Sequence, residues 1–114
     1  MIITGDASLL NVNLDDLFNR VQSAIEFPWD GVEFEIILFP DQGSLQAEYK
    51  CMFGVDVDYI AFTQRKVRKI YLSIEDTTEQ VVAHEMCHIL TAHLGDSLPY
   101  VWHERIAQYG ERHI

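Results

Sequence analysis

The chain has 114 residues, the size of one domain, and we expect a single domain over residues 1–114. Hydrophobic residues make up 48% of it and charged residues 23%, values that are ordinary for a globular protein and argue against disorder. The 8 basic and 18 acidic residues give a formal charge of −10. This balance argues against a nucleic acid or an anionic membrane as partner, because both attract positively charged surfaces.

The chain shows no targeting or membrane signal. No apolar run has the length of a transmembrane helix, and the first residues lack the charged and apolar regions of a signal peptide. A cytoplasmic location is therefore expected. The two cysteines, Cys51 and Cys87, do not form a disulfide framework, and we expect Cys87 to be a buried apolar residue on a helix.

The first predicted element is a helix over residues 13–27. Asn13 is suited to cap it, and Asp15 and Asp16 match the positive end of the helix dipole. One apolar stripe runs along it: Leu14, Leu17, Phe18, Val21 and Ile25. The stripe predicts packing against a core.

Short strands are predicted next. Alternating or β-branched stretches predict strands over residues 32–39, 45–53, 59–63 and 69–74. Residues 40–44 carry the proline, aspartate and glycine of a turn. The last two strands are expected to form a hairpin across the turn of residues 64–68, which contains three basic residues.

Two helices are predicted to end the chain. The first covers residues 77–94, with Asp76 as cap, Glu79 in the capping-box position and Gly95 as the stop. The second begins near Ser97, two residues before a proline, and ends about Gly110. Helix, strands, helix and helix is an α+β pattern.

The first of these two helices contains the sequence His84-Glu85-Met86-Cys87-His88. Two histidines four residues apart lie on the same face of a helix, close enough to bind one metal ion. Zinc suits imidazole nitrogens and keeps an open position for water in catalytic sites. Glu85 can then reach that water as general base, so we predict Zn²⁺ on His84 and His88.

The third ligand has three candidates. His93 lies five residues after His88, roughly 140° around the helix, and points away from the metal if the helix is straight. His103 and Glu104 are adjacent on the last helix, so only one of them can face the ion.

The HExxH sequence followed by Glu104-Arg105-Ile106-Ala107 on a second helix resembles the gluzincins, and the short chain resembles their minimal members, the minigluzincins. The resemblance implies a zincin-like fold with an N-terminal helix, a small, mainly antiparallel sheet, the zinc helix and a C-terminal glutamate helix. It implies Glu104 as the third zinc ligand and hydrolysis of a peptide or protein substrate. It also implies that the substrate lies extended along the outer strand of the sheet, which would be 59–63 or 69–74.

Fourteen residues separate His88 from His103, a spacing similar to that of SprT-like proteases. Those families have glycine and proline directly after the third histidine, whereas this chain has Glu104 and Arg105. Glu104 is therefore preferred as the ligand.

Gluzincins also use a tyrosine or histidine to stabilise the oxyanion that develops during water attack. Tyr109 is the preferred candidate here, with Tyr100 and His113 as alternatives. Gln108 is a candidate for orienting a zinc histidine through its second ring nitrogen.

Two other functions stay open. His84, His88 and His93 resemble, faintly, the three histidines of YbeY-type endoribonucleases, which would make the protein a zinc hydrolase of RNA. The chain could also be a non-catalytic binding or regulatory protein with a zincin fold, although the presence of Glu85 argues against that. The oligomeric state is not indicated.

Overall fold

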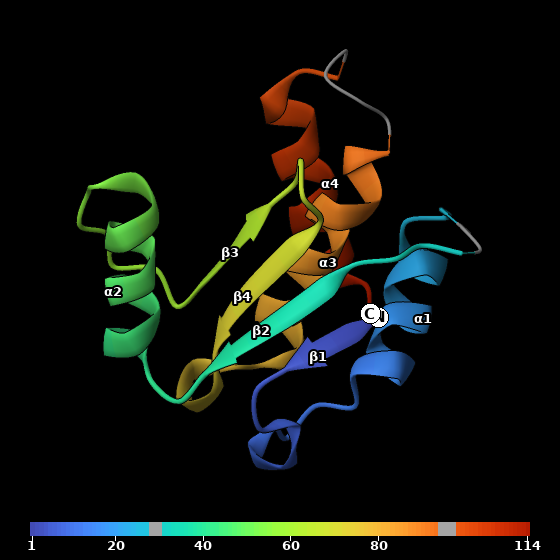
Figure 1. Ribbon diagram of the computed structural model, residues 1–114. Helices are drawn as coiled ribbons and strands as arrows, with labels where there is room; N and C mark the ends of the chain where they lie inside the picture. The colour runs from blue at the N-terminus through green and yellow to red at the C-terminus, as the bar shows by residue number, and fades with distance from the viewer. Residues whose placement is uncertain (28–30, 94–97) are drawn as a thin grey trace.

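A computed structural model describes residues 1–27, 31–93 and 98–114. The helices and strands alternate irregularly along this part of the chain. They are β1 (Ile2–Thr4), α1 (Leu14–Ala24), β2 (Glu35–Phe39), α2 (Gln42–Phe53), β3 (Ala61–Gln64), β4 (Lys69–Ser73), α3 (Glu79–Ala92) and α4 (Tyr100–Arg112), with short 3₁₀ turns at Ala7–Leu9 and Ile74–Asp76. The predicted α+β class is confirmed (Figure 1).

The four described strands form one mixed sheet in the order β1-β2-β4-β3. β1 and β2 are parallel, β2 and β4 are parallel, and β3 is antiparallel to β4. The prediction of a mainly antiparallel sheet is therefore wrong. The hairpin between β3 and β4 is confirmed, and it leaves β3 as an outer strand next to α3.

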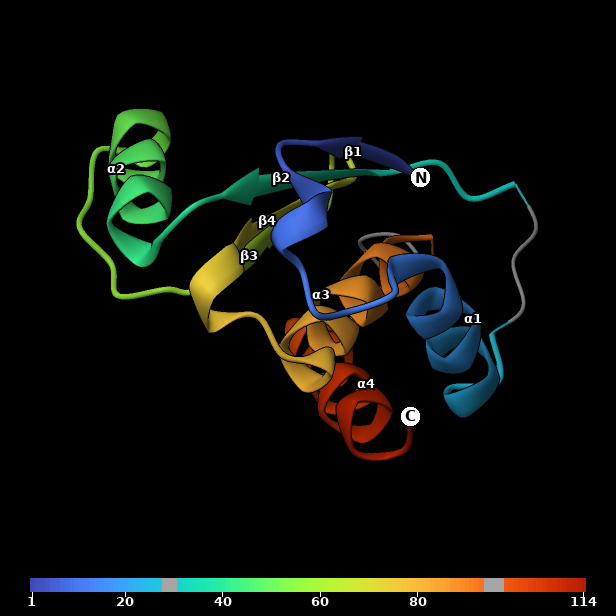
Figure 2. The same cartoon turned by 90° about the horizontal axis from the view of Figure 1, so that it is seen from below.

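The sheet has a helical layer on each face. Figure 2 shows α1, α3 and α4 on one side of the strands and α2 on the other. The larger core lies between the sheet and the three helices, and it contains the buried face of α3: Val82, Ala83, Met86, Cys87, Ile89 and Leu90. A smaller cluster lies between α2 and the sheet and consists of Leu45 from α2 with Phe62 and Tyr71 from the strands.

The predicted strand over residues 45–53 is wrong, because this segment is the helix α2. Its apolar residues alternate in sequence, but Leu45, Tyr49 and Met52 have helical spacing and meet the smaller core cluster. Asp41 caps the helix by accepting a hydrogen bond from the Ser44 amide at 2.8 Å. Gly54 ends it with a φ of 75°, a conformation that glycine adopts without strain.

The predicted helices around the motif are confirmed with different bounds: α3 begins two residues later than expected, and α4 ends at Arg112 instead of about Gly110. Asn13 caps α1 as expected. Thr78, rather than Asp76, caps α3 by accepting a hydrogen bond from the Val81 amide. The predicted boundary residues Gly95 and Ser97 lie outside the described residues.

Among the described residues, no helix combines the length and the apolar character needed to cross a bilayer.

Candidate metal centre

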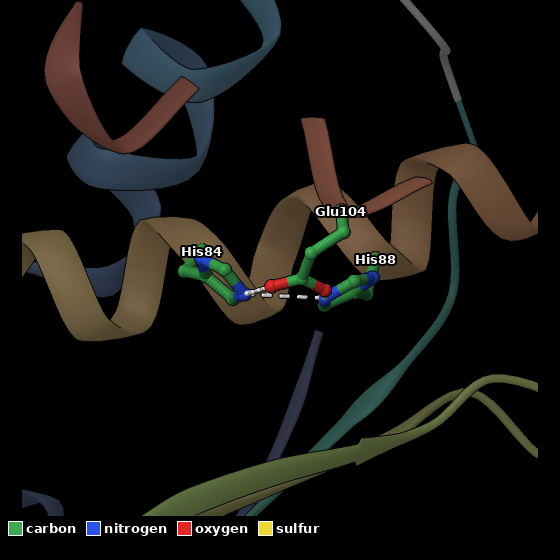
Figure 3. Close-up of side chains that lie close together, drawn as sticks. All are labelled: His84, His88 and Glu104. Carbon is green, nitrogen blue, oxygen red and sulfur yellow. Dashed lines mark hydrogen bonds and ion pairs between the residues drawn. The ribbon is translucent and has the colours of Figure 1, made fainter. Parts of the chain in front are cut away.

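The two motif histidines and Glu104 meet at one point between α3 and α4. Nε2 of His84 lies 3.3 Å from Nε2 of His88. The Glu104 carboxylate lies between the rings, with Oε1 2.9 Å from His84 Nε2 and Oε2 3.2 Å from His88 Nε2. Figure 3 shows the three side chains converging from the two helices.

This geometry fits a metal ion. The ligand atoms of a tetrahedral ion with bonds of about 2.0 to 2.1 Å lie about 3.3 Å apart, close to the separations found here. One atom from each of His84, His88 and Glu104 lies within 4.8 Å of the others, so this group could hold a metal ion.

The local sequence explains why both histidines face Glu104. Residues four apart on α3 lie one turn from each other, and the neighbouring positions 86, 87, 89 and 90 are buried in the core. Helix α3 is thereby fixed in rotation, with the histidine face turned toward α4 and the edge of the sheet.

Two features of the histidine rings suit metal binding. Burial lowers the pKa of His88 to about 4, so its imidazole is neutral near pH 7 and can offer a lone pair. His84 Nδ1 lies 3.2 Å from Oε1 of Glu111, to which it can donate a hydrogen bond. A proton on Nδ1 leaves the lone pair of Nε2, the atom that faces Glu104, for a metal ion.

Glu111 was not predicted from the sequence, which suggested Gln108 for this role. Gln108 is exposed on α4 and makes none of the contacts with the two histidines given above. Glu111 lies seven residues after Glu104, so two turns of α4 bring both carboxylates to the same face. That spacing is the signal that could have indicated it.

Glu85 extends from α3 toward the outer strand β3. The Thr63 hydroxyl donates a hydrogen bond of 2.5 Å to Oε2 of Glu85. Burial raises the pKa of the Glu85 carboxyl, and the hydrogen bond from Thr63 acts in the opposite direction. Thr63 was not predicted, since the two residues lie 22 positions apart and nothing in the sequence links them.

A cleft of about 400 Å³ opens over these groups. Its polar lining includes His84, Glu85, His88, Glu104 and Tyr100. The Tyr100 hydroxyl lies 3.5 Å from Oε2 of Glu104. Arg65 brings a positive charge to the same lining, with its guanidinium 5.8 Å from the centre of the Tyr100 ring.

The other predicted candidates lie elsewhere. His93 is exposed at the end of α3, where its ring lies nearly perpendicular to that of Phe27, with the ring centres 6.1 Å apart. His103 is buried on α4 and contributes no atom to the group of possible metal ligands.

The structure does not bring Tyr109 to the cleft. Its ring stacks on His113 at 3.9 Å and lines a separate hollow between α1 and α4. Five residues on a helix turn through roughly 140°, which directs Tyr109 away from the face that carries Glu104. Of the oxyanion candidates, Tyr100 is the one that lines the cleft.

Cys87 is fully buried, as expected, and burial raises the pKa of its thiol to about 12.

Comparison with protein-family models, with curated proteins and with solved structures gives no match for this chain.

Proposed function

We propose that this protein is a zinc-dependent metallopeptidase. The observation that carries the proposal is the convergence of His84, His88 and Glu104 directly beside Glu85, in a cleft next to an outer strand. Three protein ligands leave a tetrahedral ion with one position for water, the arrangement of catalytic rather than structural zinc sites.

Zinc is the ion that best suits this donor set. Two neutral imidazoles and one carboxylate are the ligands of many peptidase zinc sites, whereas Mg²⁺ and Ca²⁺ prefer sites made of oxygen atoms alone. A zinc ion in this site would polarise a carbonyl group and lower the pKa of a water molecule.

Glu85 is the general base in this proposal. Its carboxylate accepts a proton from the attacking water and passes it to the amine nitrogen that leaves. The hydrogen bond from Thr63 holds the carboxylate in place, and burial keeps its pKa above that of an exposed glutamate, which favours proton transfer near neutral pH.

Tyr100 takes the role first considered for Tyr109. Its hydroxyl is on the cleft side of α4, beside Glu104, and can donate a hydrogen bond to the carbonyl oxygen as negative charge develops there.

The substrate in this proposal is an extended peptide added to β3. β3 is hydrogen-bonded to β4 on one side and lies at the end of the described sheet, so its other side can accept a further strand. The cleft is lined by every residue of β3 and by Arg65, which follows it.

The RNA-hydrolase alternative loses support from the position of His93, which is exposed and lies away from the triad. The non-catalytic alternative is tested directly by comparing the wild type with Glu85→Gln.

The metal is tested first, on protein purified without added zinc. We expect close to one equivalent of zinc in the wild type and less than about a tenth of an equivalent after changing both His84 and His88 to Ala, since Glu104 is then the one remaining ligand of the three and cannot hold the ion alone. His93→Ala is the matched control and should keep its zinc.

Peptidase activity is tested next, with a panel of peptides and denatured proteins. Glu85→Gln should keep its zinc and lose about 10²- to 10⁴-fold in kcat, because the amide cannot accept the proton. Equal rates for the two proteins, or no cleavage by the zinc-loaded wild type, would overturn the proposal.

A further inference from the structure

The cleft has two chemically different ends, separated by the outer strand. The polar end holds the possible metal ligands. The other end is lined by four aromatic rings, Tyr49, Phe53, Tyr59 and Phe62, which we call the aromatic shelf. The shelf takes no part in the chemistry proposed above.

Ring contacts build the shelf around Tyr49. The ring centre of Tyr49 lies 4.6 Å from that of Phe53, 5.3 Å from that of Tyr59 and 5.0 Å from that of Phe62. Phe62 in turn stacks on Tyr71 at 4.3 Å. The inner rings are therefore fixed by the smaller core cluster.

The outer rings are only half covered. Phe53 is 47% exposed and Tyr59 45% exposed, whereas Phe62 is buried. An apolar group that covered these rings would bury a large apolar area, and this burial would stabilise the complex. They lie in the same cleft as Glu85 and His88, rather than on an unrelated surface.

The alternation of β3 connects the two ends. Thr63 faces α3, where it binds Glu85, and Ala61 packs toward the larger core on the same side. Phe62 faces the opposite side and belongs to the cluster under α2. Residues directly opposite each other in an antiparallel pair lie on the same face of the sheet.

A peptide strand paired antiparallel with β3 would therefore alternate between the two ends. Its residues opposite Ala61 and Thr63 would face the metal ligands, and the residue between them, opposite Phe62, would face the shelf.

We propose that the aromatic shelf is a side-chain subsite that selects substrates with an aromatic or large aliphatic residue at the position opposite Phe62. This inference rests on the proposed function, because it takes the ligand to be an extended peptide at β3. The shelf would make the cleft selective for one substrate side chain, and two of its rings, Tyr49 and Phe53, come from α2 on the other face of the sheet.

The experiment measures binding separately from turnover. Zinc-loaded Glu85→Gln protein is titrated with fluorescent octapeptides of Ala and Thr in which a single Phe, Leu or Ser is moved along the sequence. We expect the Phe and Leu peptides with the best register to bind about 10- to 100-fold more tightly than their Ser counterparts, the range set by burying one such side chain.

The shelf is then changed in the same background. Phe53→Ala and Tyr59→Ala should each weaken binding of the Phe peptide by about 10-fold and leave the Ser peptide within about 2-fold, since only the former loses buried apolar area. Phe53→Leu should retain most of the preference for the Phe peptide over the Ser peptide. Val67→Ala is the matched control, because Val67 is an exposed apolar residue in the turn between β3 and β4 and does not line the cleft.

Circular dichroism and zinc content verify that each variant is folded. Equal affinity for Phe, Leu and Ser peptides, an equal loss for all of them in the shelf variants, or no peptide binding at all would overturn the subsite. Selective binding without cleavage by the wild type would instead reject the peptidase proposal and leave the subsite standing.

Discussion

The Glu111 carboxylate lies beside His84, with its Oε1 atom 3.2 Å from Nδ1, the ring nitrogen opposite the one that faces Glu104. One histidine is thus held between two carboxylates from the same helix. A carboxylate in this position orients the ring and makes it a stronger donor to a metal.

We predict that Glu111→Ala weakens zinc binding by about 10- to 100-fold, the usual effect of removing such a partner. Competition with a chromophoric chelator measures the affinity. Gln108→Ala, on the same helix, should bind zinc like the wild type. An unchanged affinity in Glu111→Ala would show that the contact does not contribute to metal binding.

Thr63 is expected to position the general base. Thr63→Val keeps the shape of the side chain and removes the hydroxyl that donates to Glu85. We predict a loss of about 10-fold in kcat with unchanged zinc content, consistent with one hydrogen bond to a charged group. Thr63→Ser should restore most of the rate.

The same substitution should change the pH profile. The Thr63 hydrogen bond lowers the pKa of Glu85, so its removal raises that pKa. The base acts in its ionised form, and the acidic limb of kcat against pH should therefore move to higher pH in Thr63→Val. A limb in the same place would contradict the positioning role.

Tyr100 and Tyr109 offer a matched pair on α4. Tyr100→Phe removes a hydroxyl from the cleft and should lower kcat by about 10²-fold, the lower range for losing one oxyanion donor. Tyr109→Phe changes a ring that stacks on His113 outside the cleft and should have the wild-type rate. The reverse order of effects would restore Tyr109 as the oxyanion donor.

Gly110 allows α3 and α4 to pack closely enough to form the centre. A Cβ atom at this position would collide with Sγ of Cys87 and press on Ile25. We predict that Gly110→Ala lowers the free energy of unfolding by about 1 to 3 kcal/mol, as overpacking usually does. Urea denaturation gives this value.

Cys87→Ala provides the test of the cause. Removing Sγ makes room for the new methyl group, so the penalty of Gly110→Ala should be smaller in a Cys87→Ala background. The same penalty in both backgrounds would mean that another contact is responsible.

Features that depend on near neighbours along the chain could be predicted from the sequence. The spacing of His84 and His88 places both rings on one helical face, and the apolar positions around them predict the helix, although its cap is Thr78 and not the expected Asp76. The β3–β4 hairpin and α1 follow from similarly local patterns. Glu104 was named through the resemblance to gluzincins together with its place on a second helix.

The local sequence pattern gave a wrong prediction where tertiary packing determines the secondary structure. The segment that became α2 alternates like a strand, but burial of Leu45, Tyr49 and Met52 under the sheet favours the helix. β1 is only three residues long and gains its structure from pairing with β2. The parallel pairings could not be inferred from strands whose order in the sheet was unknown.

The distant side chains that contact the motif could be identified only from the three-dimensional packing. Thr63 reaches Glu85 because β3 lies at the edge of the sheet beside α3, and Glu111 reaches His84 because α4 crosses α3 closely at Gly110. The aromatic shelf combines residues of α2 with Tyr59 and Phe62. Such contacts depend on how helices and strands pack in space, and this packing is set by the whole core rather than by the residues that touch.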